Sequence, residues 1–172
     1  RPHLADKIQF KMSDVTQAEF PEASFDLIYS RDALLHIADK ETIFALFHKW
    51  LAPGGRIFLT DYCRGDKKQK DYSEEFKQYV AQRQYNLLTV SEYVQLLKKA
   101  GFLNVQAEDI SGDTVKTLIK ELERLENIKD DFLKEFTADD LDFLKQGWEA
   151  KIKRGADGDK SWCACYAVKS KN

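Results

Sequence analysis

Two side chains suited to moving a proton, Asp32 and His36, lie four residues apart in the chain. An imidazole has an ordinary pKa of ~6.5, so a histidine can accept a proton near neutral pH. If residues 32–36 are helical, this spacing puts both side chains on one side, where the carboxylate can orient the imidazole or attract an amine. The alternative is that Asp32 caps the following helix and that His36 is an ordinary histidine.

A second group of residues has the chemistry to bind a phosphate, because arginine offers a planar fork of donors and lysine and tyrosine add single contacts. Tyr79 and Arg83 share one face of a predicted helix, and Tyr85 follows. Tyr62 ends a predicted central strand, where α/β sheets bind ligands. Lys151 lies in a cation-rich helix end. The ordinary alternatives are core packing for the tyrosines, a solvated charge for Arg83, and a solvated or helix-dipole role for Lys151.

Bulk composition restricts the class of protein. The chain has 172 residues, 43% of them hydrophobic, and a net charge of -2, which predicts one folded domain rather than a disordered chain. The near-neutral charge argues against a nucleic-acid or membrane-surface partner. Cys63, Cys163 and Cys165 offer neither a disulfide pattern nor metal-ligand spacing. Without a leader or a long apolar run, we expect a cytoplasmic protein that uses no metal and does not insert into a membrane.

Strand-like and helix-like segments alternate along the chain, which predicts an α/β domain with a largely parallel sheet. The sequence has no GxGxxG turn, so we expect the second part of a doubly wound domain whose first strand and helix lie upstream. The predicted strands are 8–12, 25–30, 56–62, 102–110 and 161–169, and the predicted helices are 39–51, 72–84, 89–101, 114–128 and 138–154.

The order strand, acidic turn, strand, helix, Pro-Gly-Gly turn and strand resembles the second half of class I S-adenosylmethionine-dependent methyltransferases. In that resemblance, Asp14-Val15 matches the turn that contacts adenine, residues 25–28 match the fourth strand, and residues 51–56 match the turn before the fifth. Four further segments resemble the phosphoethanolamine N-methyltransferases, which methylate phosphoethanolamine stepwise toward phosphocholine. These segments are IYSRDALLHI at 28–37, TDYC at 60–63, YVAQRQY at 79–85 and GWEAKIK at 147–153.

The resemblance implies a Rossmann-like class I methyltransferase fold that is partial, because the N-terminal glycine-rich part is absent. Residues 1–172 would form one domain with helical lid insertions at about 66–100 and 114–154. The glycine-rich loop, the acidic residue that binds ribose and a catalytic tyrosine are all expected upstream. Whether this segment is active without those upstream residues is therefore left open, and we expect a monomer.

The same resemblance implies the chemistry: N-methylation of phosphoethanolamine or its mono- and dimethyl forms with S-adenosylmethionine, leaving S-adenosylhomocysteine and feeding phosphatidylcholine synthesis. A comparison with relatives that divide the steps favours the later two methylations. His36 and Asp32 would be catalytic. The implied cofactor contacts are Asp14, Val15, Arg31 and Asp32, and the implied phosphate contacts are Tyr62, Tyr79, Arg83, Tyr85 and Lys151.

Two other functions remain open at this stage. The first is methylation of a different small amine, against which the phosphate-binding set argues. The second is a non-catalytic methyltransferase-like domain that binds a phosphobase or regulates a partner. Retention of His36, Asp32 and Arg83 argues against this second alternative, since a binding module needs no base at the amine.

Overall fold

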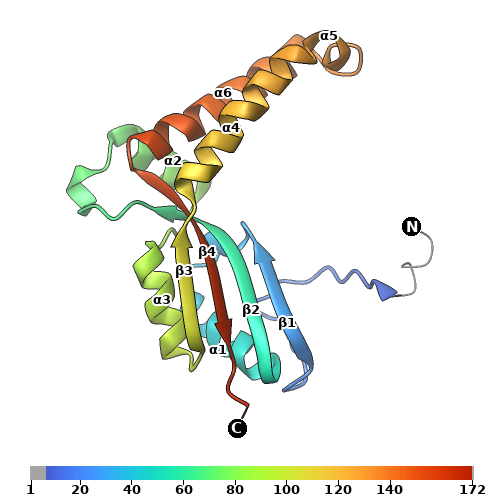
Figure 1. Cartoon of the computed structure of the whole chain (residues 1–172), viewed down its shortest axis with the longest axis vertical. Coiled ribbons are helices and arrows are strands. Elements are labelled where there is room, and N and C mark those ends of the chain that lie inside the picture. Colours follow the sequence, from blue (N-terminus) through green and yellow to red (C-terminus); the bar gives the residue numbers. More distant parts are fainter. Residues whose placement is uncertain (1–6, 172) are drawn as a thin grey trace.

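The computed structural model describes residues 7–171, in which helices cover one face of a four-stranded sheet and a helical hairpin projects beyond one end (Figure 1). The strand order is β1-β2-β4-β3. The strands are β1 Phe25–Arg31, β2 Leu51–Arg64, β3 Leu103–Asp109 and β4 Lys160–Val168. The helices are α1 Lys40–Trp50, α2 Glu74–Arg83, α3 Val90–Lys99, α4 Ser111–Asn127, α5 Lys129–Phe132 and α6 Ala138–Ala156, with short 3-10 turns η2 Leu34–His36 and η3 Gln69–Asp71.

The prediction of an α/β domain is confirmed, but the prediction of a largely parallel sheet is wrong for the described strands. Only β1 and β2 run parallel, while β4 lies antiparallel to both β2 and β3. The reason is the connection between β3 and β4. The α4–α6 hairpin returns the chain to the sheet end that it left, so that Asp109 at the end of β3 pairs with Cys163 near the start of β4.

The core lies between the sheet and helices α1 and α3. Alternation along β2 points Ile57 and Leu59 to this side, where both are fully buried. Helix α1 begins where the Asp39 carboxylate accepts a hydrogen bond from the backbone N–H of Thr42 at 3.0 Å. Helix α3 buries Tyr93 and packs against β3. It therefore forms part of the core layer, although it lies within the segment 66–100 that we expected to form a lid.

The predicted strand at residues 8–12 is wrong. These residues have no regular structure, and Phe10 is 96% exposed. An alternating sequence forms a strand only when a neighbouring backbone supplies hydrogen bonds, and no described strand pairs with this segment.

The other helical segments gather at the end of the sheet where β1 and β2 finish. Helices α4 and α6 pack along one another, and an ion pair between Lys145 and Glu126 at 2.7 Å joins them (Figure 1). Helix α6 begins with a capping box between Thr137 and Asp140. Between residues 7 and 171, none of the helices has the length and apolar character needed to cross a bilayer.

Candidate active site

Asp32 and His36 are presented by two different local structures. Asp32 follows β1 in the left-handed region at φ +48°, and its N–H donates to the carbonyl of Thr60 at 2.8 Å. The Thr60 hydroxyl also donates to the Asp32 carboxylate at 3.3 Å. His36 ends the three-residue turn η2, whose N-cap is Ala33. Residues 32–36 therefore do not form one helix, so the condition for a shared helical face is not met, and Asp32 does not cap η2.

Three tyrosines form an aromatic corner next to His36. The Tyr85 ring lies 5.2 Å from the His36 ring, 5.5 Å from the Tyr79 ring and 6.4 Å from the Tyr62 ring, between centroids. Tyr85 reaches this place because α2 ends at Gln84, which adopts the left-handed conformation at φ +53° and turns the chain back. Tyr85 thus connects the candidate base to the predicted phosphate contacts.

We call the space beside this corner the cationic hollow. It has a volume of about 470 Å³, and its side chains from β2, α2 and α6 include Arg83 and Lys151. Within residues 7–171, neither of these two cations has an ion-pair or side-chain hydrogen-bond partner. The polar and aromatic residues around the hollow are Tyr62, Tyr79, Gln82, Arg83, Tyr85, Phe143, Trp148, Lys151 and Arg154.

Burial and neighbouring charges shape the electrostatics of the cationic hollow. Burial raises the pKa of the Tyr79 hydroxyl, so this group is a neutral hydrogen-bond donor at physiological pH. Burial also lowers the pKa of Lys151, with the nearby Arg83 and Arg154 acting in the same direction and Asp32 opposing them. Arg154 is already engaged, because its guanidinium stacks 3.7 Å from the Tyr79 ring centroid and pairs with a glutamate.

A smaller hollow of about 270 Å³ adjoins the cationic hollow, and we call it the Asp32 hollow. Tyr62 and Lys151 line both spaces. Arg31 and Asp32 lie in the smaller one, so the structure brings a carboxylate close to the cationic wall. The two hollows together present positive charge on one side and Asp32 on the other, which suits a ligand with an anionic and a cationic end.

Asp14 and Val15 lie at a third, apolar hollow. The Asp14 carboxylate accepts hydrogen bonds from the N–H and the hydroxyl of Thr16, both at 2.8 Å, and these bonds lower its pKa. Val15 lines a space of about 400 Å³ together with Phe47 and Trp50. This space shares no lining residue with the other two, but its wall includes the chain on both sides of Arg31-Asp32.

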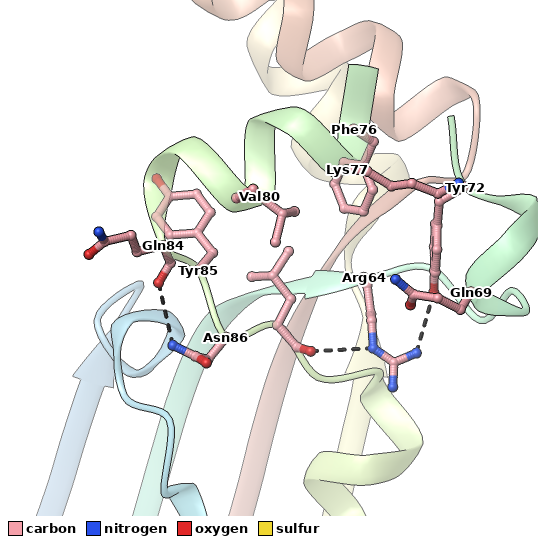
Figure 2. A pocket seen from close by; sticks show the side chains of 11 residues that line it. Arg64, Gln69, Tyr72, Phe76, Lys77, Val80, Gln84, Tyr85 and Asn86 are labelled. Carbon is pink, nitrogen blue, oxygen red and sulfur yellow. Dashed lines mark hydrogen bonds between the residues drawn. The ribbon is translucent and has the colours of Figure 1, made fainter. Parts of the chain in front are cut away.

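A fourth space, the Arg64 hollow, lies on the other side of α2 and has a volume of about 500 Å³ (Figure 2). Arg64 donates to the carbonyl of Leu87 and to the hydroxyl of Tyr72, both at 3.3 Å, and it forms an ion pair with Glu92. Its guanidinium is therefore satisfied by the protein. Tyr85 lines this hollow as well as the cationic hollow.

The sequence analysis did not assign a site role to Lys160, Trp162 or Thr60. Trp162 is buried, and it also lines the Asp32 hollow. Lys160 is 1% exposed and opens β4. No local sequence signal marks this lysine, because its burial depends on how β4 pairs with β2.

A comparison with known protein families shows to which family the chain belongs. The profile of the methyltransferase domain family matches residues 2–107, which is more than half of the chain. The chain belongs to this family.

The chain resembles curated relatives over nearly all of its length. It is 44% identical over 162 residues to phosphoethanolamine N-methyltransferase 1 of Zea mays, covering 94% of this chain and 32% of the relative. It is 41% identical over 167 residues to phosphoethanolamine N-methyltransferase of Plasmodium falciparum, covering 96% of this chain and 62% of the relative. The chain thus spans about a third of the plant relative and less than two thirds of the parasite one.

A solved structure confirms the class I methyltransferase fold. Phosphoethanolamine N-methyltransferase 2 of Haemonchus contortus, in complex with phosphomonomethylethanolamine and S-adenosylhomocysteine, superposes on this chain with a TM-score of 0.86 at 36% identity. The match covers 91% of this chain and 36% of that protein.

Proposed function

We propose that this methyltransferase N-methylates a phosphobase: phosphoethanolamine or its mono- and dimethyl forms, toward phosphocholine. The observation that carries the proposal is the pair of unneutralised cations, Arg83 and Lys151, in a hollow that opens toward Asp32. A phosphate dianion supplies the missing counter-charge at the cationic end. The substrate ammonium then meets Asp32, which is the carboxylate on the wall of the adjoining space.

His36 is the candidate general base. An ammonium with a pKa of ~10 has no lone pair and must lose a proton before nitrogen can attack a methyl carbon. The His36 side chain is exposed and lies against the Tyr85 ring, so it can exchange protons with water as well as with a bound amine. Asp32 attracts and orients the amine, and the tyrosine hydroxyls and two cations fix the phosphate. Such positioning accounts for a large part of the rate acceleration in reactions of this type.

The residues present fit S-adenosylmethionine, which would supply the methyl group on a sulfonium. The apolar hollow beside Val15 and Trp50 suits a flat purine, and the exposed Asp14 carboxylate can accept from its amine. Arg31, the last residue of β1, leads from that hollow to Asp32. By the same proposal, S-adenosylhomocysteine leaves as product. The proposed chemistry uses no metal.

The decisive experiment uses the longest form of the protein that contains these residues, and it measures transfer of a labelled methyl group from S-adenosylmethionine to phosphoethanolamine and to its mono- and dimethyl forms. The His36→Ala variant should lower kcat at least ~100-fold, as expected for loss of a general base. His48→Ala is the matched control. His48 lies on α1 and packs against the Phe102 ring, so its replacement should leave kcat unchanged. The substrate that turns over identifies the methylation step, for which the later two steps are predicted.

The same assay tests the non-catalytic alternative. If the protein binds phosphocholine but transfers no methyl group to any of the three amines, it is a phosphobase-binding domain and the proposed reaction is wrong. The predictions of a monomer, of a cytoplasmic location and of no nucleic-acid partner belong to this proposal too. Sedimentation of the purified protein at two concentrations tests the first of them.

A further inference from the structure

Strand geometry places Lys160 behind the wall of the proposed site. In the antiparallel pairing of β2 and β4, Tyr62 lies opposite Trp162, and Lys160 is two residues before Trp162 on the same face of the sheet. The Lys160 Nζ atom lies 3.3 Å from the Tyr62 ring centroid, 4.7 Å from the Trp162 ring and 5.7 Å from the Tyr79 ring. Three aromatic rings that line the two hollows therefore surround one ammonium.

This ammonium is buried without an oxygen partner. Lys160 is 1% exposed, and its Nζ atom has no hydrogen-bond partner in the part of the chain that the structure describes. Lys40 provides an internal comparison, because it is equally buried but donates to the carbonyls of Ile37 and Asn86. Cation–π contact stabilises a buried ammonium only in part. Burying the Lys160 ammonium without an oxygen partner therefore lowers the stability of the fold, and an apolar side chain could fill the same space without this cost.

Charges from every neighbouring element act on Lys160. Lys151 and Arg154 on α6 repel its charged form, while Asp32 after β1 and Asp61 on β2 attract it. Burial is the largest influence, and together with the two cations it lowers the pKa of Lys160 to about 7. A further negative charge beyond the Tyr62 ring would favour the protonated form.

We propose that Lys160 is a specificity-determining residue that acts from behind the Tyr62 ring and makes the cationic hollow select a doubly charged phosphate. This inference rests on the proposed function. In the empty site at pH 8, Lys160 is mostly neutral, and a dianion bound against Tyr62 and Lys151 stabilises its ammonium. Lys160 therefore takes up a proton as the ligand binds. Choline, which lacks the phosphate, causes no such uptake.

The test is calorimetric binding of phosphocholine and of choline at pH 8 in two buffers that differ in ionisation enthalpy. For the wild-type protein, we expect proton uptake approaching one per phosphocholine. Lys160→Met should abolish the uptake, weaken phosphocholine binding about 10-fold and leave the affinities for choline and S-adenosylhomocysteine unchanged. Lys153→Met is the matched control, because Lys153 is an exposed cation near the end of α6 that pairs with Asp157.

A stability measurement separates this role from a structural one. Removing a poorly solvated buried charge should stabilise the fold against urea at pH 6, whereas loss of a structural residue would destabilise it. Lys160→Gln serves as a second variant and should bind phosphocholine as weakly as Lys160→Met.

Each adverse result has a distinct meaning. If Lys160→Met binds phosphocholine within twofold of wild type, or retains proton uptake, the assignment of Lys160 is wrong. Absence of proton uptake by the wild-type protein also overturns it, without need of any variant. If the wild-type protein does not bind phosphocholine at all, the proposed function itself is wrong.

Discussion

The cationic hollow and the Arg64 hollow differ in how the protein treats their positive charges. The two spaces have similar volumes, about 470 and 500 Å³, and both contain tyrosines and an arginine. In the Arg64 hollow the guanidinium is engaged by a carbonyl, a hydroxyl and Glu92. In the cationic hollow, Arg83 and Lys151 have no such partners among the described residues. A candidate anion site is therefore distinguished by positively charged side chains without partners, and not by its volume or by the presence of an arginine.

The two hollows also share a wall, which makes one a control for the other. Tyr85 lines both, and α2 separates them. Changes on either side of α2 should therefore separate ligand binding from stability. Arg83 and Arg64 form the most informative pair, because Arg83 has no partner among the described residues and Arg64 is fully engaged.

The largest effect on binding is expected for Arg83→Met. A hydrogen bond to a charged group contributes about 1.5–3 kcal/mol, so phosphocholine should bind roughly 10- to 100-fold more weakly. Stability should change little, because Arg83 is exposed and has no partner in the described chain to lose. Calorimetric titration gives the affinity and urea unfolding gives the stability. A variant that binds phosphocholine normally would place the phosphate elsewhere.

The next effect concerns Lys40, which joins the segment that carries His36 to the segment that carries Tyr85. Lys40 is 2% exposed and donates to the carbonyls of Ile37, next to His36, and Asn86, next to Tyr85. Lys40→Met leaves both carbonyls unsatisfied, which should lower the free energy of unfolding by about 1–3 kcal/mol. It should also lower kcat more than it raises KM, because His36 loses its fixed place beside Tyr85 while the cations remain.

The exposed Lys49→Met on the same helix is the control for Lys40 and should change neither quantity. Equal loss of activity in both variants, or a change in KM alone, would show that Lys40 does not position His36.

A smaller effect is expected for Arg64→Met, the counterpart of Arg83→Met. Arg64 is partly exposed, so the loss of its ion pair with Glu92 and of its hydrogen bonds should cost about 1 kcal/mol of stability. Phosphocholine affinity should stay within twofold of wild type. Weaker binding in this variant would contradict the distinction between the two hollows.

Local sequence patterns predicted most of the secondary structure correctly. Asp39 with Thr42, and Thr89 with Glu92, are recognisable helix starts, and both cap helices as their spacing indicates. The direction of β4 could not be predicted in this way. It depends on whether α4 and α6 lie on the sheet or project from its end, which is a long-range packing outcome (Figure 1).

The candidate site shows the same division between local and long-range information. The four-residue spacing of Tyr79 and Arg83 was sufficient to predict their shared face, and both line the cationic hollow. Their phosphate-binding role stays a prediction that came from the family resemblance. Lys160 escaped notice because its burial against Tyr62 depends on the register of two strands far apart in the sequence. A lone lysine carries no such information.

The last expected effect is a change in the pH dependence of stability at the carboxylate next to Tyr62. Burial raises the pKa of Asp61 to about 6, although hydrogen bonds from the Tyr93 hydroxyl and the Tyr62 N–H oppose the shift. Asp159, near the Arg64 hollow, shows the opposite direction: hydrogen bonds from Lys67 and Ser73 outweigh its burial and lower its pKa.

Because the unfolded chain releases the Asp61 proton near its ordinary pKa of ~3.9, the folded state binds more protons between about pH 4 and 6. The Asp61 contribution to stability should therefore fall as the pH rises through that window, by at most ~1.4 kcal/mol per pH unit. Asp61→Asn removes this slope, so the difference in unfolding free energy between wild type and variant should shrink steadily from pH 4.5 to 6.5 in urea titrations. The exposed Asp113→Asn control should show a constant difference. A constant difference for Asp61→Asn as well would mean that the carboxylate is solvated in the folded protein, which would weaken the contrast between the two regions.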